Sequence, residues 1–168
     1  MLKFSLKLYF ASKSYIEMKF TPRKINTFLL FKLPAAFFTG VRVASISETN
    51  SVVRVRHRWV NQNPFKSMFW AVQGMASELS TGILVMKAIS DSGEKVSMLV
   101  TNMNAVFTKK AVGKIRFECN DGALIKEVIK RAVETGDGQT VLVTSEGINE
   151  EGVSVSKFEF EWSLKVKS

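Results

Sequence analysis

Glu78 is the one formally charged residue in a long apolar stretch, residues 67–86. A carboxylate surrounded by apolar side chains loses part of its hydration, which favours the protonated form and raises its pKa. A glutamate with a raised pKa can accept and return a proton near neutral pH, as general acid–base catalysis requires. The alternative is a structural ion pair with an arginine or lysine of a neighbouring strand, because an unpaired buried carboxylate is costly.

Small side chains flank Glu78 on the helix that this stretch predicts. A helix turns by about 100° per residue, which places five residues on one stripe: Ala71, Gly74, Glu78, Gly82 and Val85. The stripe either lets the helix pack closely against a sheet or a second subunit, or leaves a slot for an extended ligand. In the second case Ala71 and Gly74 would contact the substrate.

Asn63 directly precedes Pro64, a pair that is typical of a helix start, with asparagine as the N-cap and proline in the first turn. The Asn63 side chain would cap the helix, orient a substrate or a water molecule, or do both. Free amides at a helix start also favour developing negative charge. The aromatic residues Phe69 and Trp70 fit either plain packing or the floor of an acyl pocket.

These residues belong to a predicted helix over residues 63–87, which reads NPFKSMFWAVQGMASELSTGILVMK. Its apolar residues recur at the three-and-four spacing of a helix, and the other faces are also largely apolar, which indicates a buried helix. A membrane span is an alternative of suitable length. The glutamate, the glutamine and several hydroxyl groups in its middle argue against that alternative. We therefore expect no membrane span.

Six strands are predicted around this helix. The expected helices and strands, in chain order with the central helix omitted, are residues 21–33 (helix), 39–48, 51–60, 94–107 and 114–119 (strands), 122–135 (helix), and 139–148 and 153–166 (strands). In the last strand Phe158, Phe160 and Trp162 share one face, which is typical of a sheet covered on one side. The order predicts an α+β fold in which a six-stranded, mostly antiparallel sheet wraps around the long central helix.

Length and composition restrict the function classes. The chain has 168 residues, which suggests one domain. One cysteine, Cys119, excludes an internal disulfide and fits a reducing compartment, so we expect a cytoplasmic protein. With one histidine and one cysteine there is no zinc cluster and no Cys/His dyad within a single chain, and we expect no metal site. The sequence contains no glycine-rich phosphate loop and no GxSxG motif.

The net charge of +9 is compatible with nucleic acid, an anionic membrane surface or a phosphate-bearing ligand. The basic residues are scattered along the chain, however. The densest run, Arg54 to Arg58, alternates with valines and is typical of the solvated face of a strand. Nucleic acid is therefore the least favoured partner.

The first residues differ from the rest of the chain. Residues 1–17 are basic and mildly amphipathic, without the apolar core and cleavage site of a secretory signal. We expect residues 1–19 to be an N-terminal extension, or to reflect a start codon assigned upstream of Met18. Residues 20–168 are expected to form the one domain.

The chain resembles hotdog-fold acyl-CoA thioesterases over residues 20–167. The resemblance lies in three segments, namely Leu33-Pro34 with Gly40-Val41-Arg42-Val43, Asn63 through Glu78, and Val106-Phe107-Thr108-Lys109-Lys110-Ala111-Val112-Gly113. It points to an uncharacterised branch similar to the phenylacetate-pathway-type thioesterases. Members of that family pair subunits so that their sheets join, with active sites at the subunit interface. The resemblance therefore implies a homodimer or a dimer of dimers.

The resemblance also implies site residues. In the family, an asparagine just before the central helix and an acid fifteen positions later are the working pair, and Asn63 and Glu78 match in type and spacing. Glu78 would act as general base, or as nucleophile, towards the thioester carbonyl, and Asn63 would orient substrate or water. The two residues can come from opposite chains. Backbone amides near Phe69 to Ala71 would polarise the carbonyl oxygen.

The implied substrate is a small-molecule thioester of coenzyme A, with no cofactor. Thr101, in the strand after the central helix, could bind substrate if its face of the strand reaches the site. Lys109, Lys110 and Lys114 could meet the coenzyme A phosphates, although a solvated turn explains them as well. Family members often carry a glycine, frequently preceded by histidine, where this chain has Phe69-Trp70-Ala71. That bulk leaves a non-catalytic acyl-chain or acyl-CoA binding protein as the alternative to a hydrolase.

Overall fold

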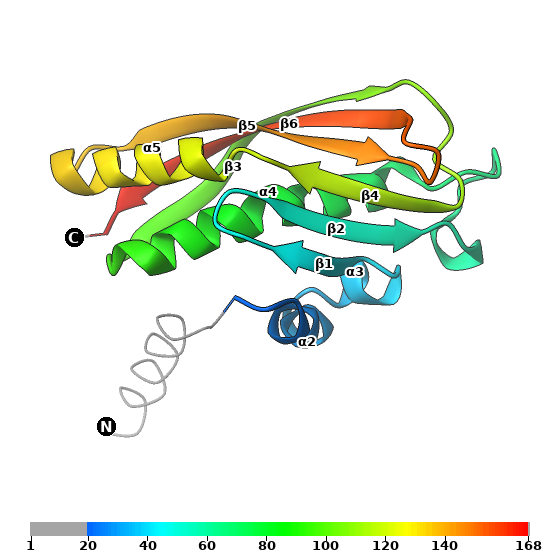
Figure 1. Cartoon of the computed structure of the whole chain (residues 1–168), viewed down its shortest axis with the longest axis horizontal. Coiled ribbons are helices and arrows are strands. Elements are labelled where there is room, and N and C mark those ends of the chain that lie inside the picture. Colours follow the sequence, from blue (N-terminus) through cyan, green and yellow to red (C-terminus); the bar gives the residue numbers. More distant parts are fainter. Residues whose placement is uncertain (1–19, 168) are drawn as a thin grey trace.

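An antiparallel sheet of six strands lies over one long helix in the computed structural model, which describes residues 20–167 (Figure 1). The strands are β1 (Arg42–Ile46), β2 (Ser51–Arg56), β3 (Val96–Phe107), β4 (Lys114–Cys119), β5 (Gln139–Ile148) and β6 (Ser154–Val166). Their order is β1-β2-β4-β5-β6-β3, and every neighbouring pair is antiparallel. The predicted sheet is therefore confirmed. The expected N-terminal extension, residues 1–19, lies outside the described residues.

The inner face of the sheet follows from the alternation of apolar residues. Phe158, Phe160 and Trp162 of β6 are all buried, whereas Lys157 between them and the hairpin is exposed. Residues on one face of a strand recur every second position, so a buried apolar row fixes which face covers the core. The predicted covered side of β6 is confirmed.

Three further helices complete the fold. Helix α2 (Pro22–Lys32) is capped by Thr21, whose hydroxyl oxygen accepts a hydrogen bond from the Lys24 amide at 3.4 Å. It is followed by the short helix α3 (Pro34–Phe38), which the sequence analysis did not predict. Helices α2 and α3 lie beside β1, and α5 (Gly122–Thr135) packs against α4 and β5 (Figure 1).

The central helix α4 (Trp70–Ser92) begins seven residues later than predicted. Its C-cap is Gly93, whose backbone is in the left-handed region with a φ of 73°. Asn63 does not cap it; the N-cap is Phe69, without a side-chain hydrogen bond. The preceding residues form a closed loop instead. There the Met68 amide donates to the Ala111 carbonyl at 2.8 Å, and Gln62 forms a bridge with Met68. These hydrogen bonds hold the backbone of residues 62–68 in non-helical conformations.

The second predicted strand also ends early, at Arg56. A 3₁₀ turn, η1 (Trp59–Asn61), follows it. Asn61 is buried, and its side-chain amide donates to the Thr39 and Arg56 carbonyls, both at 2.9 Å. Asn61 therefore ties this turn to the end of α3.

Serine side chains join α4 to the sheet. The Ser80 hydroxyl donates to the Ser77 carbonyl at 2.7 Å and lies 2.7 Å from the Ser145 hydroxyl of β5. Ser51 of β2 donates to the Ser80 carbonyl. Buried hydroxyls that bond one another avoid the cost of desolvation, so these bonds fix α4 on the sheet.

None of the helices in residues 20–167 has the length and hydropathy that a bilayer crossing requires. The apolar face of α4 instead contributes to the core formed with the sheet.

Candidate active site

Glu78 lies on α4, two turns beyond its start, and its side chain is exposed in the protomer rather than buried. Among residues 20–167 its carboxylate has neither a hydrogen-bond donor nor an ion-pair partner. The structural ion pair considered above is therefore not formed within this part of one chain. Surrounding protein atoms still displace water on one side of Glu78, and this desolvation raises its pKa.

The small residues on the Glu78 stripe lie over aromatic rings of β6. A methyl group on Gly82 would lie 3.4 Å from the Trp162 ring, and one on Gly74 would lie 3.8 Å from the Phe158 ring. Close packing of α4 on the sheet thus accounts for both glycines. A substrate contact at Gly74 stays a prediction.

Strand β3 extends the inner face of the sheet beside α4. In the register with β6, Met103 lies opposite Phe160 and Ala105 lies opposite Phe158, so both face the α4 side. Met103 is 43% exposed, and Phe107 on the same face is 48% exposed. A largely uncovered apolar surface therefore continues the inner face of the sheet next to β6, the strand on which the Glu78 stripe packs. Its members are Met103, Ala105 and Phe107.

Thr101 lies at a β-bulge, where the register with β6 shifts between Val100 and Asn102. Its hydroxyl donates to the Glu161 carboxylate at 2.6 Å. Glu161 alternates with the buried Phe160 and Trp162, so this bond directs Thr101 to the outer face of the sheet. The structure therefore does not bring Thr101 to Glu78 within one chain. Strict alternation along β3 could not predict this, because the bulge inserts one extra residue.

Asn63 organises the loop before α4 rather than the helix itself. Its side-chain oxygen accepts hydrogen bonds from the amides of Phe65 at 2.9 Å and Ser67 at 3.2 Å. Lys66, inside this turn, has a φ of 57°, which only a tight turn explains for a residue with a side chain. No hydrogen bond joins Asn63 to Glu78 in the described chain. The two residues are therefore held separately, one by a loop and one by a helix.

The first turn of α4 leaves two amides available. The Phe69 amide donates to the Asn61 carbonyl at 2.8 Å, and the Val72 amide donates to the Phe69 carbonyl at 3.0 Å. The amides of Trp70 and Ala71 have no acceptor within residues 20–167. Because the first amides of a helix lack intrahelical partners, these two can donate to an external oxygen. Of the predicted amides, the one at Phe69 is already used.

Phe69 and Trp70 do not form the floor of a pocket in the protomer. Their rings meet edge to face with centroids 5.7 Å apart, and the side chains are 43% and 53% exposed. Gln73, one turn after Phe69 on α4, is buried, with 4% of its surface exposed. It was not among the site residues predicted from the sequence. Its amide nitrogen donates to the Met68 carbonyl at 3.2 Å, and its amide oxygen has no partner in the described chain. Gln73 thus links the loop to the helix start.

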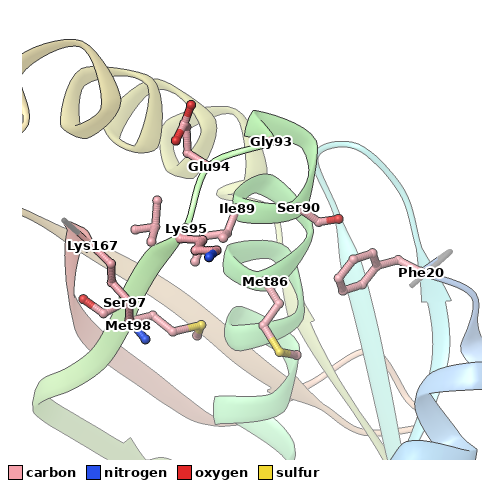
Figure 2. A pocket seen from close by; sticks show the side chains of 11 residues that line it. Phe20, Met86, Ile89, Ser90, Gly93, Glu94, Lys95, Ser97, Met98 and Lys167 are labelled. Atoms are coloured by element: carbon pink, nitrogen blue, oxygen red, sulfur yellow. The ribbon is translucent and has the colours of Figure 1, made fainter. Parts of the chain in front are cut away.

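A cavity of about 450 Å³ lies between the C-terminal end of α4 and the start of β3 (Figure 2). Its apolar wall includes Met86 and Ile89 from α4 and Met98 from β3, and Figure 2 shows these side chains around the cavity. Ile89 lies on nearly the same stripe of the helix as Glu78 and roughly 17 Å along the axis, whereas Met86 lies roughly 12 Å along the axis and about 80° around it. This cavity was not predicted from the sequence, because its walls come from segments far apart in the chain, including Phe20, α4, β3 and Lys167.

The lysines suggested for phosphate binding differ in what they contact. Lys114 lies 3.2 Å from the Glu150 carboxylate, and Lys109 lies 3.9 Å from that of Glu151. The Lys110 ammonium instead donates to the Phe65 carbonyl at 3.2 Å. Among these three, Lys110 alone has no acidic partner in the described chain. Residues 20–167 also contain no group of three or more His, Cys, Asp or Glu side chains arranged to hold a metal ion.

Sequence comparison identifies the family. A family model described as "Domain of unknown function" matches residues 22–164. The chain belongs to this family, DUF4442. No curated protein matches the sequence.

Solved structures similar to this DUF4442 protein share its fold. A protein of unknown function from Pseudomonas aeruginosa, described as a "probable thioesterase", has a TM-score of 0.74 and 22% identity and covers 88% of this chain and 97% of its own. A thioesterase from Haemophilus influenzae has a TM-score of 0.66 and 12% identity, with coverage of 89% and 94%. With the sheet order and α4, these matches confirm the predicted hotdog fold.

A protein from Staphylococcus aureus is also similar, with a TM-score of 0.59 and 13% identity over 76% of this chain and 94% of its own. Solved structures of that protein include one with a glutamate replaced by alanine and one with a glutamine, fifteen positions earlier, replaced by alanine. The second of these is described as a thioesterase enzyme.

Proposed function

We propose that this DUF4442 protein hydrolyses acyl-CoA or a related thioester at an interface between two copies of the chain. The observation that carries the proposal is the carboxylate of Glu78, which has no partner within residues 20–167 and lies on the inner side of the sheet whose uncovered apolar surface belongs to β3. An acidic group with a raised pKa in such a place is suited to proton transfer.

The relatives support the reaction class. Proteins of the same fold from Pseudomonas aeruginosa and Haemophilus influenzae are described as a probable thioesterase and a thioesterase. In the Staphylococcus aureus protein the altered amide and acid residues are fifteen positions apart, the spacing that separates Asn63 from Glu78 here. This agreement supports Asn63 and Glu78 as the working pair.

The edge of the sheet supports a homodimer, or a dimer of dimers. Strand β3 has 12 residues, and within residues 20–167 it pairs on one side only, with β6. An exposed edge strand with apolar side chains favours pairing with another strand. Joining β3 to the same strand of a second copy would cover the surface of Met103, Ala105 and Phe107. It would also allow the Asn63 loop of one protomer to approach Glu78 of the other.

The proposed mechanism uses Glu78 as general base. Its carboxylate accepts a proton from a water molecule, whose oxygen attacks the thioester carbonyl. The amides of Trp70 and Ala71 donate to the oxyanion that forms, and Asn63 orients the water or the substrate. As the carbon–sulfur bond breaks, the proton passes from Glu78 to the leaving thiolate, which yields a carboxylic acid and a thiol. In an alternative form of this scheme, the Glu78 carboxylate itself attacks the thioester carbonyl as the nucleophile.

The cavity at the end of α4 is our candidate for the acyl tail. The cavity residues Met86 and Ile89 lie about 12 to 17 Å from Glu78 along the axis of α4, and an acyl tail would have to reach them around the closely packed Gly82 and Val85. Methionine side chains adapt their shape to flexible apolar ligands. Lys110, which has no acidic partner among the described residues, is the candidate for the coenzyme A phosphates. No metal or cofactor has a role in this scheme.

A non-catalytic acyl-CoA binding protein is the second candidate. It is favoured by Trp70, whose exposed indole stands at the helix start where the thioester carbonyl must approach the amides. In that case the cavity would hold the acyl chain without turnover.

The experiment compares the parent protein with Glu78→Gln on short, medium and long acyl-CoA, using a thiol reagent to follow release of coenzyme A. We expect Glu78→Gln to lower kcat/KM by about 100-fold or more, because the general base is lost. Glu134→Gln on α5 is the control and should retain full activity. If the parent does not exceed Glu78→Gln on any substrate, the proposed hydrolysis by Glu78 is overturned. Native mass spectrometry that shows retained acyl-CoA without turnover would then support the binding protein.

We also propose that residues 20–168 are sufficient for this function and that the protein is cytoplasmic. A protein that starts at Met18 should hydrolyse the same substrates with unchanged kcat and KM. Loss of activity in that protein would assign a functional role to the residues before Met18.

A further inference from the structure

Exposed aromatic residues and unbalanced positive charge occur in the same part of the chain. Residues 20–77 contain eight lysines and arginines but one acidic residue, Glu48. Within the same range, Trp59 is 84% exposed, Phe38 is 68% exposed and Val60 is 50% exposed. Large apolar side chains this exposed, next to one another, indicate an interaction surface.

Hydrogen bonds and ring contacts join these residues into one surface, the aromatic–arginine patch, formed by Phe38, Arg42, Arg58, Trp59 and Val60. The Arg42 guanidinium lies 3.7 Å from the ring centroid of Phe37, and the Phe37 and Phe38 rings meet edge to face at 5.6 Å. The side-chain amide of Asn61, next to Val60, donates to the carbonyl of Thr39, next to Phe38. Helix α3 and the end of β2 accordingly lie at one end of the molecule (Figure 1).

The two arginines of the patch lack acidic partners within residues 20–167. One guanidinium nitrogen of Arg42 donates to the Phe37 and Val41 carbonyls, both at 2.7 Å, which fixes this group in place. Desolvation, with the positive charge of Arg58 close by, lowers the pKa of Arg42. Two neighbouring guanidinium groups without a carboxylate form a site that favours an anion, and phosphate is the anion that guanidinium groups bind with two hydrogen bonds.

We propose that the aromatic–arginine patch docks this protein on the surface of an anionic lipid bilayer. Phe38 and Trp59 would enter the headgroup region, and Arg42 and Arg58 would bind lipid phosphates. The proposal does not depend on the proposed hydrolysis.

The shape of the patch favours a bilayer over a folded partner. Phe38 and Trp59 stand out from the surface, and the cavity described above is lined by none of the patch residues. Aromatic side chains are enriched at the bilayer interface, where the ring is partly buried and no complementary pocket is needed. Anionic lipids attract clustered arginines and lysines, and the attraction weakens as salt rises.

The experiment sediments the full-length protein with vesicles of phosphatidylglycerol and phosphatidylcholine, and with vesicles of phosphatidylcholine alone. We expect binding to the anionic vesicles that is several-fold tighter than to the neutral ones and that falls as salt is raised. The Phe38→Ser/Trp59→Ser double variant and Arg58→Gln should each weaken this binding by about fivefold or more. Leu142→Ser, which removes a 57% exposed leucine from β5, and Lys130→Gln on α5 are the controls and should bind as the parent does.

Thermal unfolding checks that every variant is folded, and turnover of a short acyl-CoA is measured in parallel. Equal binding by the parent and the folded patch variants would overturn the proposal, since binding would then arise elsewhere in the chain. No binding of the parent to anionic vesicles would also overturn it, as would binding of labelled RNA or DNA, but not vesicles, through the same residues. A lack of turnover in the parent would affect the proposed hydrolysis and leave the vesicle result standing.

Discussion

At the residue scale, the protonation of Glu78 links the candidate site to pH. The raised pKa of Glu78 arises from desolvation without a compensating cation in the described chain. A general base works only when it is deprotonated. We therefore expect kcat/KM to rise with pH through an inflection above the ordinary glutamate value of about 4.3. Measuring kcat/KM for one acyl-CoA substrate as a function of pH checks this. A kcat/KM that does not change between pH 4 and pH 8 would contradict the role of Glu78.

The same pKa shift predicts the stability of Glu78→Gln. Between the unfolded pKa and the raised folded pKa, the native state binds more protons than the unfolded state, so the free energy of unfolding falls as pH rises through that window. Glutamine removes this dependence. We expect Glu78→Gln at pH 7 to be unchanged, or more stable by up to about 1 kcal/mol, with the smaller values favoured because the group is solvent-exposed. Urea unfolding of the parent and of Glu78→Gln measures the difference in the free energy of unfolding. A clear loss of stability in the variant would identify Glu78 as a structural residue instead.

Cys119 should be chemically silent in the folded protein. It is fully buried, and this burial raises the pKa of its thiol to about 12. The thiolate is the reactive form, so we expect no reaction with a thiol reagent until the protein is unfolded. Titration with and without denaturant checks this. A reactive native thiol would contradict the described packing and would also interfere with the thioesterase assay.

At the element scale, α5 meets the turn between β1 and β2 without room for a side chain. A methyl group on Gly122 would lie 2.5 Å from the Thr49 Cα atom, and backbone atoms cannot move aside as a flexible side chain can. We expect Gly122→Ala to lower the free energy of unfolding by about 1 to 3 kcal/mol. Gly138→Ala, with no atom within 4 Å of the added methyl group, is the matched control and should be nearly neutral. Similar losses in both variants would show that the contact at Gly122 is not responsible.

The start of α4 and the bulge in β3 are two features that the local sequence pattern does not predict. The periodicity of apolar residues correctly predicted a long helix, but the Asn63-Pro64 start signal was wrong. Those residues form a loop, because Met68 bonds to Ala111, a residue more than forty positions away in the chain. The bulge at Thr101 likewise depends on pairing with β6. Both features depend on hydrogen bonds between residues that are far apart in the chain, so neither could be predicted from the local sequence.

At the scale of the whole molecule, the exposed edge β3 predicts self-association. Met103 is on the face of β3 that a second copy would cover, and a charge there would be buried without a partner. We expect Met103→Glu to convert a dimer into a monomer and to lower hydrolysis by about tenfold or more. Analytical ultracentrifugation and the acyl-CoA assay measure the two effects.

Leu142→Glu provides the matched control for this change. Leu142 is 57% exposed on β5, where it alternates with the buried Val141 and Val143, so its side chain is on the outer face. It should leave both assembly and hydrolysis unchanged. A Met103→Glu variant that remains a dimer, or a parent that is monomeric at high concentration, would contradict assembly through β3.

The sequence by itself determined the elements and the chemistry they could carry. Apolar periodicity depends on neighbouring residues, so it predicted six strands, the central helix and the covered face of β6. Residue type alone singled out Glu78 as the one acid in the apolar stretch. Only the tertiary structure decided that Glu78 is exposed, that part of the inner face of β3 is uncovered, that Thr101 faces away, and that a cavity lies at the end of α4. These features depend on which distant strands are paired and which helix turns face them, and packing between residues far apart in the chain sets both.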